Sequence, residues 1–177
     1  VVNPDDVIKE YGADSMRLYE MFMGPLEAVK PWNTRGVEGV FRFLKRAWKM
    51  VAEAEIDDSA ALSKEQLKVL HYTIKKVTED TDTLNFNTAI SQMMIFLNEF
   101  TKCEKLPREA AETFVKLLAP YAPHLCEELW EILGKKGTIA YEQWPSCNED
   151  LIKSSEVEVL VQIAGKPKAR IMMPAEA

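Results

Sequence analysis

The chain has 177 residues and a formal net charge of −6, which is the length of one domain with at most a small appendage. Hydrophobic residues make up 47% and charged residues 28%, so the composition favours a folded core over intrinsic disorder. The longest unbroken apolar run, Met93 to Leu97, is far shorter than the roughly 20 residues of a membrane span, and only 7 glycines disfavour a fold built from tight turns.

Two short helices are predicted in the first part of the chain. Asn3 can accept a backbone N–H at the start of the first helix, and Gly12 stops that helix. Asp14 offers a cap for the second helix, a mostly apolar segment that ends at Gly24-Pro25.

Five further helices are predicted from apolar residues at spacings of three and four. The first runs from Val37 to about Ala54, and the second begins at the capping box Ser63-Lys64-Glu65-Gln66. The third follows the polar stretch Thr81 to Thr83, the fourth begins at Pro107 and the fifth at Pro123. The core expected for the resulting antiparallel bundle includes Trp48, Phe86, Met93, Leu97, Phe114, Leu118 and Trp130.

A β-hairpin is predicted near the end of the chain. Residues Val157 to Ile163 alternate apolar and polar, Ala164-Gly165 can form the turn, and Ala169 to Met173 can form the second strand. Because a lone two-stranded hairpin is marginal in water, we expect it to dock on the helices or to begin a further domain. Before it, Tyr141 and Trp144 are expected to fold back over the bundle. The predicted fold class is mainly α, an antiparallel helical bundle with a small C-terminal β-hairpin.

The common local signatures of catalysis are absent from the sequence. It contains no G-x-G-x-x-G, no G-x-x-x-x-G-K-[ST] and no G-x-S-x-G, so no catalytic or cofactor-binding residue is assigned. His124 and Cys126 are two residues apart and point to different faces of a helix, which disfavours a metal site. Glu127, Glu128 and Glu131 resemble a carboxylate cluster, but a solvated face is the simpler interpretation.

Charge is distributed unevenly along the chain. Between residues 30 and 49, six basic residues stand against one glutamate, a local net charge of +5, whereas the rest of the chain carries −11. At 100° per residue, the basic residues at 42, 45, 46 and 49 share one helix face, opposite Val40, Leu44 and Val51. Such a face in an acidic protein suits a polyanion, although a merely solvated face would show the same pattern. The candidate binding residues are Arg35, Arg42, Lys45, Arg46 and Lys49.

Several blocks of the sequence resemble class I aminoacyl-tRNA synthetases. Asn3 to Leu18 resembles the segment directly after their Lys-Met-Ser-Lys-Ser loop, and Met23 to Leu26 with Lys30-Pro31-Trp32 narrows the likeness to leucyl-tRNA synthetases of the bacterial type. The blocks Phe86 to Ser91 and Leu118 to His124 continue it. Several blocks in family order, over essentially the whole chain, are more specific than any single motif. A valyl or isoleucyl enzyme is the nearest alternative.

The resemblance implies three parts. These are a connecting, stem-contact type helical segment over 1–36, an anticodon-binding-type bundle over 37–146, and a linker and hairpin over 147–177 that begin a truncated C-terminal domain. It also implies that leucine activation, with ATP and Mg²⁺, belongs to a longer parent enzyme. None of that parent's catalytic or editing residues can be placed on this chain, so the isolated fragment is expected to be inactive.

The implied partners are tRNA(Leu) and the catalytic and editing domains of the same parent chain. We expect a cytoplasmic monomer, and three cysteines without a C-x-x-C pair fit a reducing compartment. The basic residues would hold tRNA phosphates, which fixes register without reading sequence. Leucyl enzymes of this type are not generally thought to depend on reading the anticodon. The alternative from a different functional class is a helical scaffold that binds protein and has no nucleic-acid role.

Overall fold

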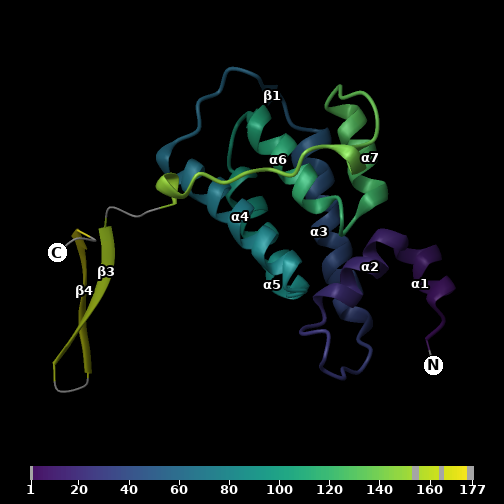
Figure 1. The fold of residues 1–177 in the computed structure, drawn as a ribbon. Helices are drawn as coiled ribbons and strands as arrows, with labels where there is room; N and C mark the ends of the chain where they lie inside the picture. Colours follow the sequence, from purple (N-terminus) through teal and green to yellow (C-terminus); the bar gives the residue numbers. More distant parts are fainter. Residues whose placement is uncertain (1, 153–155, 164–165, 175–177) are drawn as a thin grey trace.

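The computed structural model describes residues 2–152 completely, together with the backbone of residues 156–163 and 166–174. The helices are α1 (Pro4–Tyr11), α2 (Ala13–Phe22), α3 (Thr34–Ala52), α4 (Lys64–Asp82), α5 (Phe86–Phe100), α6 (Arg108–Leu118) and α7 (Pro123–Ile132). Figure 1 shows α3 between the α4–α5 pair on one side and α1, α2 and α7 on the other. None of the helices described is long and apolar enough to cross a membrane. The predicted fold class, a helical bundle, is confirmed.

Backbone caps explain where the helices begin and end. The predicted box at α4 is complete, since Ser63 N–H donates to Gln66 Oε1 at 2.8 Å and Gln66 N–H donates to Ser63 Oγ at 3.2 Å. Gly12, at a φ of +86°, ends α1 as expected. Helix α3 begins earlier than predicted, at Thr34, because Asn33 Oδ1 accepts the backbone N–H two residues further on at 3.0 Å.

One buried apolar cluster extends from α1 to the segment after α7. Of the predicted core residues, Met93, Leu97, Phe114, Leu118 and Trp130 are at most 1% exposed, which confirms them. The same cluster contains residues of α1 and α2, so the first helices share the core of the bundle.

Helix α3 buries most of the predicted arc, including Val40, Leu44 and Val51, but the buried arc is shifted around the helix. Trp48 and Phe41 are only half-buried, and so is Phe86 on α5, whereas Ala47 and Met50 are fully buried. The reason is that α3 contacts α1, α2, α5 and α7, and these neighbours flank it on two sides. Helices on two sides cover more of α3 than a single apolar stripe does, so Ala47 and Met50 are buried as well.

A two-residue parallel pairing was not predicted. Ile56–Asp57 (β1) pairs with Leu106–Pro107 (β2), and Leu106 N–H also donates to Glu55 O at 2.8 Å. The pairing ties the connection between α3 and α4 to the start of α6. Strands this short have no period that a sequence could show.

The C-terminal hairpin is confirmed as an antiparallel ladder. Strand β3 (Glu156–Ile163) pairs with β4 (Lys166–Pro174), with Val161 opposite Ala169 and an irregular register directly after it. The predicted turn at Ala164-Gly165 and the predicted docking of the hairpin lie outside the described residues.

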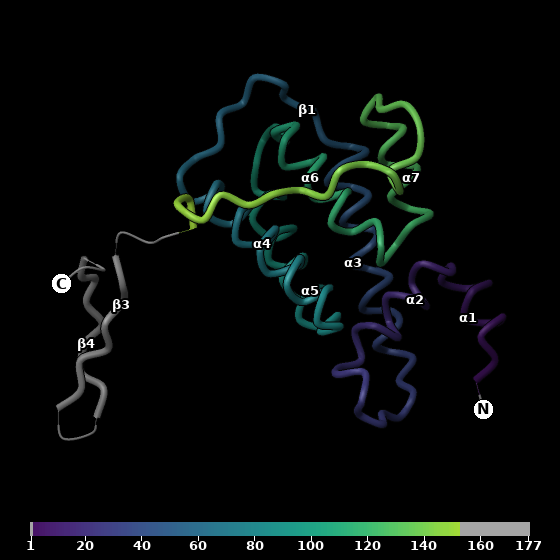
Figure 2. Tube along the Cα trace, viewed as in Figure 1, coloured from purple at the N-terminus to yellow at the C-terminus, as the bar shows by residue number. Residues whose placement is uncertain are grey.

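The segment after α7 runs back across α6 and α4, as Figure 2 shows for the yellow-green part of the trace. Trp144 Nε1 donates to Thr78 Oγ1 on α4 at 2.8 Å, so this aromatic folds back as predicted. The prediction for Tyr141 is wrong, because its side chain is 92% exposed. A short 3-10 helix, Ile139–Tyr141, turns Ile139 inward instead.

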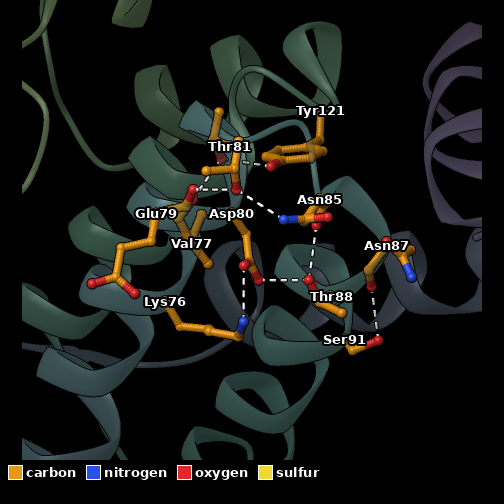
Figure 3. Close-up of polar contacts among 11 residues, drawn as sticks. Lys76, Val77, Glu79, Asp80, Thr81, Asn85, Asn87, Thr88, Ser91 and Tyr121 are labelled. Atoms are coloured by element: carbon orange, nitrogen blue, oxygen red, sulfur yellow. Dashed lines mark hydrogen bonds and ion pairs between the residues drawn. The ribbon is translucent and has the colours of Figure 1, made fainter. Parts of the chain in front are cut away.

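Polar contacts hold the turn between α4 and α5 (Figure 3). The buried Asp80 carboxylate accepts from Lys76 Nζ at 2.8 Å and from Thr88 Oγ1 at 2.7 Å. Next to it, the hydroxyls of Thr81 and Tyr121 lie 2.6 Å apart and join α4 to the turn before α7. Because a buried carboxylate is costly unless it is paired, the contact with Asp80 gives Thr88, within the Phe86 to Ser91 block, a structural role.

Asp14 has a different partner from the one predicted. It lies inside the first turn of α2, and its carboxylate reaches α7. There Asp14 Oδ2 accepts the N–H of Leu125 at 2.7 Å, and Oδ1 lies 2.8 Å from His124 Nδ1. The N-cap residue of α7, Ala122, supplies no side-chain cap. Asp14 therefore caps α7 from another helix, so the prediction that it caps α2 is wrong.

We expect Asp14→Ala to lower the free energy of unfolding by about 1–3 kcal/mol, because it leaves a helix N–H without its acceptor in a buried place. Urea denaturation measures this. Asp6→Ala, which removes an exposed carboxylate from the first turn of α1, is the control and should change stability by less than about 1 kcal/mol. Equal losses in the two variants would contradict the capping role.

Candidate nucleic-acid interface

The exposed face of α3 carries the predicted basic residues. All five are exposed, and none forms an ion pair with a carboxylate in the described part of the chain. Arg35 lies two turns before Arg42 and therefore on the same face. We call this surface the cationic face: Arg35, Arg42, Lys45, Arg46 and Lys49. The structure thus brings all five predicted residues together.

The local contacts orient part of this face. Arg46 Nη2 donates to Asn98 Oδ1 on α5 at 2.7 Å, and Lys45 Nζ stands 4.6 Å from the centre of the Phe41 ring. Glu38 lies on the same side of α3, so positive charge is densest from Arg42 onward. Lys30, which contributes to the local charge of +5, is not part of the face, because its Nζ donates to Met23 O at 2.5 Å.

Several cations on other elements are already paired with carboxylates. Lys75 pairs with Glu149 at 2.8 Å, and Lys105 pairs with Glu55 at 2.5 Å. Arg108 pairs with Asp58 as well. The cationic face differs from these sites because its charges have no carboxylate partner among the described residues. Unpaired and hydrated charges on long side chains can bind phosphates without first breaking an ion pair.

The glutamates of α7 divide into two kinds. Glu128 and Glu131 are exposed, in agreement with the predicted solvated face. Glu127 is half-buried and accepts from the Thr138 hydroxyl and from Ile139 N–H, the latter at 3.1 Å. The hydroxyl bond first, and then the backbone bond, lower the pKa of the Glu127 carboxyl. Glu127 therefore stabilises the turn after α7. The prediction that its side chain belongs to a solvated face is wrong.

Metal-ligating residues are not clustered in the part of the chain that the structure describes. The three cysteines are free, and burial raises the pKa of Cys126 well above its ordinary value. His71 accepts the N–H of Asn148 at 3.2 Å, far in sequence from His124. These residues have ordinary structural partners.

The sequence does not predict the two aromatic side chains that lie next to the cationic face. The apolar spacing of this helix predicts a buried face that includes Phe41 and Trp48, but both remain half-buried on the flank of α3 next to Lys45. The signal that could have found them is their spacing of seven residues, which places both rings on one side of the helix.

Comparison with known proteins identifies the family of this chain. The sequence pattern of the family described as "Anticodon-binding domain of tRNA ligase" matches residues 63–177. The chain belongs to this family of anticodon-binding domains. It is 54% identical over its whole length to a leucine–tRNA ligase of Rhodopirellula baltica, of which it spans 20%. The predicted resemblance to leucyl-tRNA synthetase is confirmed.

A solved structure has the same helical arrangement as this chain. The ternary complex of Agrobacterium radiobacter K84 agnB2 LeuRS with tRNA and LeuAMS matches the whole chain with a TM-score of 0.81 and 30% identity. The chain covers 25% of that protein. The helical arrangement is therefore shared with a region of leucyl-tRNA synthetases, and the chain spans about a quarter or less of these relatives.

Glu127→Gln should lower the stability of this anticodon-binding domain in a pH-dependent way. A carboxyl whose folded pKa is lowered stabilises the fold above its ordinary pKa of 4.5, and this contribution is lost as pH falls through the lowered value. The variant should unfold at a lower temperature than the wild type at pH 7, and the difference should shrink below pH 4.5. Thermal unfolding at several pH values measures this. Glu128→Gln is the exposed control, and a gap for Glu127→Gln that stays constant with pH would contradict the assignment.

Proposed function

We propose that this chain is the tRNA-contacting helical part of a leucyl-tRNA synthetase. The full-length enzyme would activate leucine with ATP and Mg²⁺ and transfer it to tRNA(Leu), in catalytic and editing domains outside this chain. The 54% identity to a leucine–tRNA ligase supports the leucyl assignment over a valyl or isoleucyl one. The observation that carries the proposal is the cationic face, whose five exposed charges have no carboxylate partner among the described residues.

The cationic face suits the backbone of folded RNA. Arg42 and Lys49 are seven positions apart on the helix, a rise of roughly 10 Å. The four charges from Arg42 to Lys49 would therefore act on a short stretch of ligand. Double-stranded RNA is recognised mostly through its shape, its phosphates and its 2′-hydroxyls. Phosphate contacts position a protein without reading bases. The face would therefore orient tRNA relative to the catalytic domain.

We also propose the division of the chain at residues 36 and 146. Residues 1–36 would connect to the catalytic domain, 37–146 would form the tRNA-contacting bundle, and 147–177 would lead into the C-terminal domain. The core shared by α1, α2 and the bundle would keep the first two parts in a fixed relation. We infer that the parent enzyme is a monomer and that it is located in the cytoplasm.

Replacing Arg42, Lys45, Arg46 and Lys49 together by Gln tests the cationic face in the full-length ligase that carries this chain. Each phosphate contact contributes about 0.7–0.9 to the slope of log affinity against log salt, so the slope should fall by about 3. Gln keeps helix propensity and most of the aliphatic stem, so thermal stability should change little. Cognate and non-cognate tRNA should be weakened about equally. Filter binding of tRNA over a range of salt concentrations measures the affinity and the salt slope.

The matched control replaces four exposed lysines on other elements by Gln, namely Lys9, Lys64, Lys68 and Lys136. It removes the same formal charge from other parts of the surface, so a loss of net charge alone would affect both variants alike. Equal salt slopes in the control, the variant and the wild type would show that the face is merely solvated. A helical scaffold that binds only protein would give that result.

The chain alone should neither bind ATP appreciably nor activate leucine, because it carries no phosphate-loop motif. Calorimetry with ATP and leucine-dependent pyrophosphate exchange check this expectation. Full-length ligase in the same buffers is the positive control. Exchange catalysed by the pure chain would contradict the assignment of catalysis to another domain.

A further inference from the structure

A small cavity opens beside the cationic face where α1, α2, α3 and α7 meet. Its volume is about 220 Å³, and its walls are mainly apolar. The residues that shape it include Tyr11, Phe41, Leu44, Lys45, Trp48 and Leu125. Pockets for drug-sized ligands run from about 300 to 1,000 Å³, so this one accepts little more than a single ring system.

Three aromatic side chains give the cavity its character. Phe41 and Trp48 lie two turns apart on α3, and Tyr11 on α1 packs edge-to-face against Phe41, with ring centres 5.6 Å apart and an angle of 78°. All three are half-buried, so each keeps part of its ring surface open. Aromatic rings exposed beside cationic side chains are what single-stranded nucleic acids stack on.

The cavity and the cationic face share one residue, Lys45. Its Nζ stands 4.6 Å from the centre of the Phe41 ring while its own helix face carries Arg42 and Lys49. The cavity therefore has positive charge along its Lys45 edge, which would attract an anionic group there.

We propose that this cavity binds one unstacked base of the tRNA whose phosphates the cationic face holds. This inference rests on the proposed function, which it extends from backbone contacts to one nucleotide. Unpaired tRNA bases can be splayed out and stacked on aromatic side chains, whereas bases within an RNA helix are not accessible in this way. The partner is thus RNA with an unpaired nucleotide near a stem, not a small free nucleotide.

The charges around the cavity set the direction of the bound nucleotide. Asp14 lines the cavity, but both of its oxygens are already engaged by α7. At the opposite edge, a hydrogen bond to Glu10 and the charges of Glu10 and Glu38 raise the pKa of Tyr11, so this edge is acidic. The phosphate of the nucleotide would therefore lie at the Lys45 edge, with the base directed between the rings of Phe41 and Trp48.

A pair of substitutions at one position tests the base site in the full-length ligase with a tRNA(Leu) transcript. Trp48→Leu removes the ring, and Trp48→Phe keeps one. Stacking contributes about 1–3 kcal/mol per base, so Trp48→Leu should weaken binding roughly 5- to 140-fold, whereas Trp48→Phe should stay within about threefold of wild type. The salt slope should not change in either variant, because stacking releases no counterions. Tyr141→Leu, which removes an exposed aromatic ring outside the cavity, is the control and should bind like wild type.

An abasic scan of the unpaired tRNA positions supplies the second measurement. One abasic position should weaken binding to the wild type as much as Trp48→Leu does, and should add little further loss in that variant, because both changes remove the same contact.

The possible results separate this proposal from the proposed function. Equal losses in Trp48→Leu and Trp48→Phe, a lowered salt slope in Trp48→Leu, or abasic effects that add fully at every position would each overturn the base site. If wild-type affinity persists in both Trp48 variants while the four-residue Gln variant loses its salt slope, the cationic face stands and the cavity does not hold a base. A ligase that does not bind tRNA through either surface would overturn both proposals.

Discussion

Helix α3 constrains the rest of this structure because it has neighbours on two sides. Helices α1, α2, α5 and α7 all contact it, and the side chains that they cover range from Val37 to Val51. What remains is a strip of α3 that can only face solvent. A charged side chain could not stand on the covered arc without a partner, since burying an unpaired charge is prohibitively costly. The cationic face is thus the complement of the core, and the same helix supplies both.

Polar groups inside the bundle decide how the other helices join. Asp14 reaches from α2 to the start of α7, and Asp80, which also pairs with Lys76 within α4, joins α4 to α5 through Thr88. Both carboxylates are buried. Each accepts a hydrogen bond from another helix, so the loss of that contact would leave a buried carboxylate oxygen without its partner. Such groups make the arrangement of the helices more specific than apolar packing alone.

The two proposed kinds of recognition would meet on one flank of α3. Charges on the cationic face attract a polyanion over long distances, but this attraction weakens with salt and is indifferent to sequence. The rings of Phe41, Trp48 and Tyr11 act only at contact, independently of salt. Because the chain as a whole is acidic, it would attract a polyanion mainly at the cationic face. A tRNA positioned there would be oriented by its backbone and held in register by one nucleotide.

The sequence by itself determined the helices, because their signals are local. Apolar spacing, the Ser63 to Gln66 box and the prolines act over one or two turns, and the structure contains the helices they predict. The members of the cationic face also follow from spacing alone, since a helix places residues 35 to 49 by its period. Only the tertiary structure decided what each face meets. It brought the carboxylate of Asp14 to the start of α7, left Tyr141 in solvent and gave Glu127 a partner after Gly134. It also kept Phe41 and Trp48 half-buried beside Lys45. These outcomes depend on contacts between residues distant in the chain, and the period of a single helix carries no information about its neighbours.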